Sequence, residues 1–324
     1  MKIERISKEK LDKFKELVDN AETIAIGSHI NPDGDNLGST LALRKSLELY
    51  GKDVEVLAND TIDDYLQFLP EKENYKAPSR DSYDLFMILD CSEFDRITDK
   101  LTPIAKASKN TLVIDHHVGG GIDTDLNLIY DTAPATCELV FEIIDRLNLP
   151  IDKDIATLIY TGLCTDTGRF LYANVSEYTF NAAGKLLTLG ADSEYIYRNL
   201  YQSKPIKVMK FQTEVIAKAE FFDKKAYSVI SKDLVEKHGV QMGDGETVVG
   251  MLRDLDEVNV SMILKEYDNG EYKVSLRSKD CDVAKVAREN GGGGHIKASG
   301  FSIFDDSLES ASAKALTILK EIDA

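Results

Sequence analysis

Acidic and histidine side chains follow four separate apolar stretches of this chain. Three stretches, 23–27, 85–89 and 111–115, are short enough to be buried strands, and the fourth, 155–164, has the length of a helix. The polar residues at their ends are His29, Asp33, Asp35, Asp90, Asp115, His116, His117 and Asp166. Any fold that sets the strands side by side gathers these side chains, so this pattern constrains the architecture more than any other feature.

Strands and helices alternate along the first part of the chain. The strand patterns are 23–27, 53–57, 85–89 and 111–115, and the helical patterns are 35–50, 135–147, 154–163 and 176–189. Strands that are apolar on both faces indicate an α/β fold, a mainly parallel sheet covered by helices. Ligands of such sheets bind beyond the carboxyl ends of the strands. We therefore expect one shared site at the ends of the three strands that precede His29, Asp90 and His116.

The length of 324 residues exceeds the usual size of a single core, so two domains are expected. We predict a first α/β domain at 1–190, a helical connector at 191–220 in which Pro205 can begin a new helix, and a smaller α/β domain at 221–324. In the last, strands are expected at 226–230, 258–264 and 272–277, and helices near 246–252, 283–287 and 307–322.

Charge and composition limit the partners and the compartment. A net charge of −17 opposes binding of long duplex nucleic acid, whose affinity depends on neutralised phosphates, so a nucleic-acid substrate should be short. No apolar run approaches the roughly 18 residues of a membrane span, and residues 1–10 are too charged for a signal peptide. The four cysteines are scattered, as expected for reduced thiols. These features predict a cytoplasmic protein without membrane contact.

The residues at the strand ends have the chemistry of divalent-metal ligands. Five carboxylates and three imidazoles supply enough oxygen and nitrogen donors for two cations. Asp90, at the centre of the crevice, is suited to bridge two ions about 3.5–4 Å apart. The simpler interpretation makes Asp35 a helix cap, His29 a satisfied surface residue and the other two histidines exposed loop residues. It leaves unexplained why three of only five histidines lie at these strand ends.

A glycine-rich segment, GGGGHIKASG at 291–300, is the main feature of the second half. Glycines allow backbone N–H groups to surround an anion, and His295, Lys297 and Arg277 can add charge or hydrogen bonds to a phosphate. The alternative is a flexible linker. Against it, the glycines are followed at once by an apolar strand pattern and lack the repetition of a spacer.

These motifs resemble those of the DHH family of phosphoesterases. The pattern His29 to Ser39, the single Asp90, Asp115-His116-His117, and the segment 165–169 follow the order of that family's four motifs over roughly the first 190 residues. Arg277-Ser-Lys and the 291–300 segment resemble the DHH-associated substrate-binding domain. Within the family, the C-terminal part is similar to the NrnA-like oligoribonuclease and pAp-phosphatase branch.

The resemblance implies roles for individual residues. One cation, most favourably Mn²⁺, would be held by His29, Asp33 and Asp90. The second would be held by Asp35, Asp90, His116 and Asp166, while Asp115 orients a histidine and His117 acts on the phosphoryl oxygens. The implied substrate-binding residues are Arg277, Ser278, Gly292, Gly293, Gly294, His295 and Arg169. A homodimer is implied in the same way.

The resemblance also implies the reaction: a water shared by two cations hydrolyses short oligonucleotides, linear dinucleotides such as pApA, or 3′-phosphoadenosine 5′-phosphate (pAp). Two alternatives stay open. One is an inorganic pyrophosphatase of the same superfamily, which ordinarily lacks a segment like 291–300. The other is a nucleotide sensor without turnover, which should have lost a ligand, whereas every expected position is filled.

Overall fold

The computed structural model describes residues 4–91, 94–117 and 122–323. The chain forms two compact units, Met1–Ser203 and Lys204–Ala324. The segment predicted as a connector spans their boundary: helix α7 (Ser193–Tyr201) lies in the first unit, and α8 (Ile206–Ala217), with Pro205 at its N-cap, lies in the second. Among the described residues, no helix is both long and apolar enough to cross a membrane.

The first unit is built on a six-stranded sheet in the order β3-β2-β1-β4-β5-β6, and every neighbouring pair is parallel. The strands are β1 (Thr23–Gly27), β2 (Asp53–Leu57), β3 (Tyr75–Lys76), β4 (Leu85–Leu89), β5 (Asn110–Asp115) and β6 (Leu126–Ile129). The predicted parallel α/β architecture is therefore confirmed. The strand order reverses between β1 and β4, which is where such sheets open a crevice for ligands.

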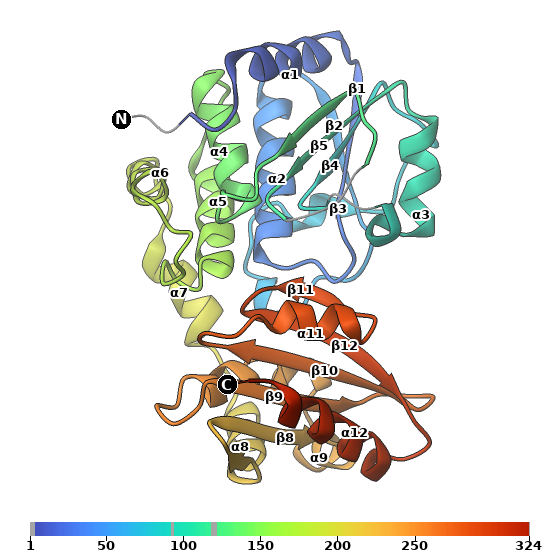
Figure 1. The fold of residues 1–324 in the computed structure, drawn as a ribbon. Helices are drawn as coiled ribbons and strands as arrows, with labels where there is room; N and C mark the ends of the chain where they lie inside the picture. The colour runs from blue at the N-terminus through green and yellow to red at the C-terminus, as the bar shows by residue number, and fades with distance from the viewer. Residues whose placement is uncertain (1–3, 92–93, 118–121, 324) are drawn as a thin grey trace. The chain divides into compact units, whose positions relative to one another are not determined.

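The strands are apolar throughout because both faces of the sheet are covered (Figure 1). Ile24 and Ile26 of β1 pack on the side of α2 (Gly34–Leu49), α4 (Thr136–Arg146) and α5 (Lys153–Asp166). Phe86 and Ile88 of β4 face the other way, toward α3 (Phe94–Ala107). Helices α1 (Lys8–Asn20) and α6 (Glu177–Thr188) also belong to this unit.

Helix α2 packs closely against α5, and glycines make the close approach possible. A Cβ atom on Gly38 would lie 2.6 Å from the Leu158 carbonyl oxygen, and one on Gly162 would lie 2.8 Å from a carboxylate oxygen of Asp35. Real Cβ contacts are longer than this, so only glycine fits at either position without movement. The first turn of α2, which carries Asp35, is therefore fixed against the last turns of α5.

The second unit has a mixed six-stranded sheet in the order β11-β12-β10-β9-β8-β7, antiparallel except for the pair β8–β9. Its strands are β7 (Glu220–Phe222), β8 (Lys225–Ile230), β9 (Val260–Glu266), β10 (Glu271–Ser278), β11 (Gly293–His295) and β12 (Ala298–Phe304). Helices α11 (Val283–Glu289) and α12 (Leu308–Glu321) cover one face. On the other face, α8, α9 (Lys232–His238) and α10 (Val248–Arg253) pack on β8 and β9.

Candidate metal centre

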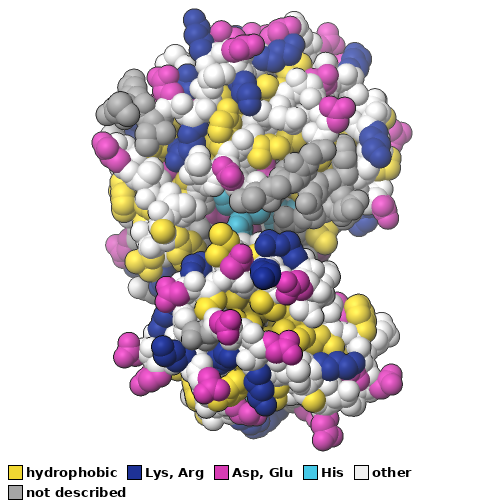
Figure 2. Space-filling view, in the orientation of Figure 1, with side chains coloured by type: hydrophobic (Ala, Val, Ile, Leu, Met, Phe, Trp, Pro, Cys, Tyr) yellow, Lys and Arg dark blue, Asp and Glu magenta, His cyan; other side chains and the backbone are white. Residues whose placement is uncertain are grey.

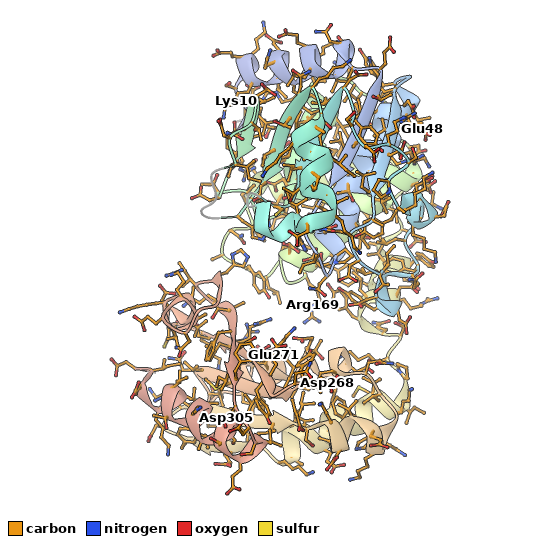
Figure 3. The ribbon with its side chains drawn as sticks, turned by 90° about the vertical axis from the view of Figure 1, so that its right-hand side faces the viewer. Lys10, Glu48, Arg169, Asp268, Glu271 and Asp305 are labelled. Carbon is orange, nitrogen blue, oxygen red and sulfur yellow. The ribbon has the colours of Figure 1, made fainter. Side chains whose placement is uncertain are left out.

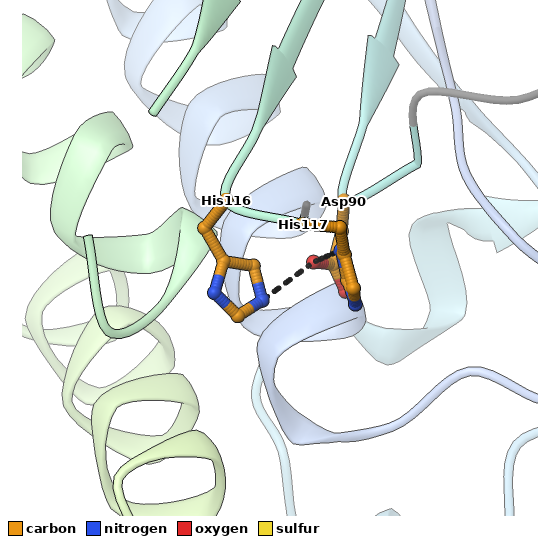
Figure 4. A group of neighbouring side chains, drawn as sticks. All are labelled: Asp90, His116 and His117. Carbon is orange, nitrogen blue, oxygen red and sulfur yellow. Dashed lines mark ion pairs between the residues drawn. The ribbon is translucent and has the colours of Figure 1, made fainter. Parts of the chain in front are cut away.

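Two strands that are neighbours in the sheet, β4 and β5, end beside one another and carry the central residues of the site. Asp90 directly follows β4, and His116 and His117 directly follow β5, as Figure 4 shows. Asp90 has a left-handed backbone with φ of +57°, and its N–H donates to the Ile114 carbonyl 3.0 Å away. Aspartate tolerates this conformation better than most residues, and such conformations are concentrated at functional sites.

Helix α2 begins at the site. Asp33 is its N-cap and accepts hydrogen bonds from the N–H groups of Asp35 and Asn36 at 3.0 and 2.9 Å. Asp35, fully buried, accepts from the N–H groups of Thr136 and Cys137 at the start of α4, at 2.6 and 2.8 Å. A cap uses one oxygen of Asp33, so capping and metal binding do not exclude each other.

His29 faces Asp90 in a way that calls for a cation or a proton between them. Its Nδ1 lies 2.6 Å from the Ile30 carbonyl oxygen, which can only accept, so Nδ1 carries the proton. The neutral ring then presents an unprotonated Nε2, 3.2 Å from Oδ2 of Asp90. Two buried acceptors at this distance repel each other, whereas a histidine held through Nδ1 and a carboxylate together suit a metal ion.

His116 lies among three carboxylates. Its Nε2 is 3.4 Å from Asp166, 3.6 Å from Asp90 and 3.8 Å from Asp35. Burial opposes a charge on this ring, but the hydrogen bond to Asp166 and the charges of Asp35 and Asp90 outweigh it and raise the pKa of His116 to about 10. The raised pKa means that the His116 ring favours its positively charged form among the three carboxylates.

Asp115 holds the histidine pair in position. One of its oxygens accepts the N–H of His116 at 2.8 Å, the N–H of His117 at 3.2 Å and Nδ1 of His117 at 2.7 Å. The two rings lie 4.4 Å apart at 60°, and Nδ1 of His117 is 3.7 Å from Asp90. The two rings therefore differ in orientation, as adjacent residues of an extended chain require.

The candidate ligands form three overlapping groups whose donor atoms lie within 4.8 Å of one another. The groups are His29, Asp33, Asp90; Asp35, His116, Asp166; and Asp90, His116, His117. Burial raises the pKa values of Asp35, Asp90 and Asp166, the last to about 7, and the neighbouring carboxylates raise those of Asp90 and Asp166 further. Such a concentration of buried acids fits cations, because they neutralise the repulsion and satisfy the oxygens.

Thr136 is a site residue that sequence analysis missed. Its hydroxyl donates to Asp90 at 3.0 Å and its N–H donates to Asp35 at 2.6 Å, so one residue orients two carboxylates. The first turn of α4 also directs its positive dipole end at Asp35. The only signal in the sequence is that a helix begins here, because nothing distinguishes this threonine from others before the fold is known.

The second unit brings together two of the predicted phosphate-binding residues. Arg277 of β10 pairs with Ala298 of β12, which pairs with His295 of β11. Residues paired directly across antiparallel strands lie on the same face, so Arg277 and His295 flank a small alanine on one side of the sheet. Ser278, the next residue of β10, is buried and donates its hydroxyl to the Cys281 carbonyl. Its hydroxyl is therefore already used in the fold.

The glycine segment forms a hairpin edge. A Cβ on Gly292 would lie 2.1 Å from the Gly300 carbonyl oxygen, and one on Gly294, at φ of +131°, would lie 2.6 Å from the Ala298 carbonyl oxygen. These two glycines are required by close packing of the backbone. Gly293 has nothing within 4 Å of such a Cβ, so it alone of the three presents open backbone.

Arg169 lies in the first unit, three residues beyond Asp166, the last residue of α5. Its guanidinium is exposed and lies 5.0 Å from the ring centroid of Tyr201. Figure 3 shows Arg169 projecting outward from this unit. In the space-filling view, histidine side chains appear together on the first unit, while acidic and basic side chains are interspersed elsewhere (Figure 2).

Comparison with protein families agrees with this architecture. Residues 23–163 match the DHH family, N-terminal domain, and residues 223–321 match the DHHA1 domain. The first match contains the parallel sheet with His29, Asp90 and His116. The second contains strands β8 to β12 of the second sheet, with Arg277 and His295. The chain therefore contains a DHH family N-terminal domain and a DHHA1 domain.

Relatives resemble the chain over nearly its full length. It is 29% identical to the bifunctional oligoribonuclease and PAP phosphatase NrnA of Thermus thermophilus, over 92% of this chain and 89% of that protein. The NrnA of Bacillus subtilis is also 29% identical, over 93% of this chain and 96% of that protein. The crystal structure of an exopolyphosphatase-related protein from Bacteroides fragilis has a TM-score of 0.92 at 28% identity, covering 99% of this chain and 98% of that chain.

Proposed function

We propose that this protein is a metal-dependent phosphoesterase that hydrolyses short oligonucleotides, linear dinucleotides such as pApA, and pAp to nucleoside monophosphates. The observation that carries the proposal is the overlap of three ligand groups through Asp90 and His116 at the reversal point of a parallel sheet. Support comes also from the two NrnA relatives, whose names give both oligoribonuclease and PAP phosphatase activity.

In this proposal, His29, Asp33 and Asp90 would hold one divalent cation, and Asp35, Asp90, His116 and Asp166 would hold the second. Mn²⁺ suits the mixed oxygen and nitrogen donors. When bound, the pair supplies an activated water nucleophile and charge neutralisation at the phosphoryl group. Other residues of the chain orient these groups. Asp115 fixes the ring of His117 through Nδ1, and Thr136 orients the carboxylates of Asp35 and Asp90 by hydrogen bonds. In the proposed reaction His117 stabilises charge on a phosphoryl oxygen, while Arg277 and His295 bind a terminal phosphate.

The experiment is a side-by-side rate comparison on pAp, pApA, a five-nucleotide RNA, a long single strand and pyrophosphate, with manganese and with a chelator. We expect release of AMP from pAp and pApA and mononucleotides from the RNA, with little activity on the long strand. Preferred hydrolysis of pyrophosphate would contradict the proposal, and stoichiometric binding of pApA without product would favour a sensor.

A further inference from the structure

The chain makes an unusual turn directly after the metal centre. Gly168, Arg169 and Phe170 follow one another with φ of +55°, +66° and +65°. Two of the three are not glycine, so this left-handed run opposes the normal preference of L-residues. The Arg169 N–H donates to the Cys164 carbonyl at 2.9 Å, and the Phe170 N–H donates to the Thr167 hydroxyl at 2.8 Å. These hydrogen bonds stabilise the strained backbone of the turn, and strained backbone of this kind is typical of functional sites.

The turn places Arg169 over an aromatic ring. Its guanidinium lies 5.0 Å from the Tyr201 centroid, and the Tyr201 hydroxyl donates to the Cys164 carbonyl at 3.1 Å. Within the described part of the chain, Arg169 forms no ion pair with a carboxylate, although the protein carries a net charge of −17. An exposed guanidinium kept away from carboxylates and on a ring face is available to a ligand.

Two further tyrosines border the same place. Tyr172 folds back against Gly168, where a Cβ would lie 2.5 Å from its ring atoms, and it is 50% exposed. Tyr65, 44% exposed, lies on the short helix η1 (Asp64–Leu66), which packs against α7. Tyr201 is the last residue of α7, so Tyr65 and Tyr201 come from two elements that pack together.

We infer that Tyr65, Tyr172, Tyr201 and Arg169 form a stacking surface for the nucleobase of the nucleotide whose phosphate lies at the metal centre. The identity of that phosphate rests on the function proposed above. A cluster of carboxylates has no attraction for a neutral base, whereas aromatic faces and a guanidinium plane stack bases of any sequence. The surface therefore gives affinity for nucleotides with weak preference among bases.

Two measurements test this inference. The first is binding of AMP to the manganese-loaded protein by calorimetry, and the second is the KM for pAp against ribose 3,5-bisphosphate, which has no base. Tyr65→Leu should weaken AMP binding and raise the KM for pAp, each by about tenfold, because one stacked ring is lost. The base-free substrate should be unaffected, and Tyr65→Phe, which keeps the ring, should restore both values.

Tyr50→Leu is the matched control, because Tyr50 is 38% exposed and caps α2 at the end opposite Asp33. An equal effect of Tyr65→Leu on both substrates would assign Tyr65 to the metal centre and overturn the inference. Unchanged AMP binding in Tyr65→Leu would also overturn the inference, and the exposed tyrosines would then be assigned to binding of a protein partner. If no substrate were hydrolysed but AMP binding still fell, the proposed reaction would fail while the stacking surface stood.

Discussion

The two units of this protein hold their candidate binding residues in opposite ways. In the first unit, Asp35 and Asp90 are buried with exposed fractions of 0% and 1%, and each has a hydrogen bond from Thr136. In the second unit, Arg277 is half-buried and His295 is exposed on a sheet face next to a hairpin edge. The first unit concentrates acidic side chains inside the fold, and the second presents basic side chains at its surface.

This difference determines how each region responds to a change. Buried carboxylates depend on one another and on a cation, so the loss of one should disturb the whole centre. A half-exposed arginine lies outside the buried cluster of carboxylates, so its loss should remove mainly its own contact with the substrate. The comparison predicts large, cooperative effects in the first unit and smaller, separable effects in the second.

The largest effect should come from Asp90→Asn. Asparagine also tolerates a positive φ, so the substitution removes the charge while preserving the backbone. Loss of a ligand shared by both cation groups should lower kcat by at least about a thousandfold, because bound metal ions contribute several kcal/mol to catalysis. Steady-state rates on pApA, with manganese content measured on the same samples, provide the check. Asp223→Asn, at φ of +43° in the second unit, is the matched control.

Arg277→Ala should have the next largest effect, and a different one. Loss of a charge-assisted hydrogen bond of about 1.5–3 kcal/mol should raise the KM for pAp and pApA about 10- to 100-fold. The kcat and the manganese affinity should stay near those of the parent. Arg288→Ala, an exposed arginine on the helix that covers the opposite face of β10, serves as control. An unchanged KM would remove Arg277 from phosphate binding.

Gly162→Ala tests whether the packing of α5 positions Asp35. The added methyl would meet the Asp35 carboxylate at 2.8 Å and the Cys137 sulfur at 2.3 Å, so the site must shift. We expect a loss of about 1–3 kcal/mol in the free energy of unfolding and weaker manganese binding. Gly184→Ala in α6 has open space around its Cβ and should be slightly stabilising. Similar results for both variants would contradict a special role for Gly162.

The sequence was informative about the first unit because polar residues that end apolar runs are visible without a structure. It predicted the parallel sheet, and it selected His29, Asp90 and His116, which lie together at adjacent strand ends. The metal-binding role of these side chains stays a prediction. These three side chains lie close together because of the topology, since the carboxyl ends of parallel strands lie at the same edge of a sheet.

Other features depend on packing that no local pattern reveals. Thr136 belongs to the site only because α4 begins opposite two carboxylates. Tyr65 and Tyr201 are 136 positions apart in the numbering and come together because η1 packs against α7. In the glycine segment, the sequence suggested an anion cradle, but Gly292 and Gly294 are already required by the approach of β12. Composition cannot separate a glycine needed for backbone packing from one needed for a ligand.

The smallest predicted effect concerns pH and sharpens the contrast between the units. In the folded, metal-free protein the pKa is raised to about 7 for Asp166 and to about 10 for His116. Unfolded values are about 3.9 and 6.5, so between about pH 4 and pH 10 the folded state binds more protons than the unfolded state. Stability of the metal-free protein should therefore fall as pH rises through this window.

Thermal unfolding of the chelator-treated protein should show a Tm at pH 8 lower than at pH 5.5 by a few degrees. Manganese should raise the Tm more at pH 8, because cations replace the bound protons and compete with them less at high pH. Metal-free Asp90→Asn should be at least as stable as the parent at pH 8, because the amide is neutral, whereas burial and neighbouring carboxylates oppose a charge on Asp90. A metal-free Tm that rises between pH 5.5 and pH 8 would mean that the buried acids of the first unit do not repel one another as their geometry indicates.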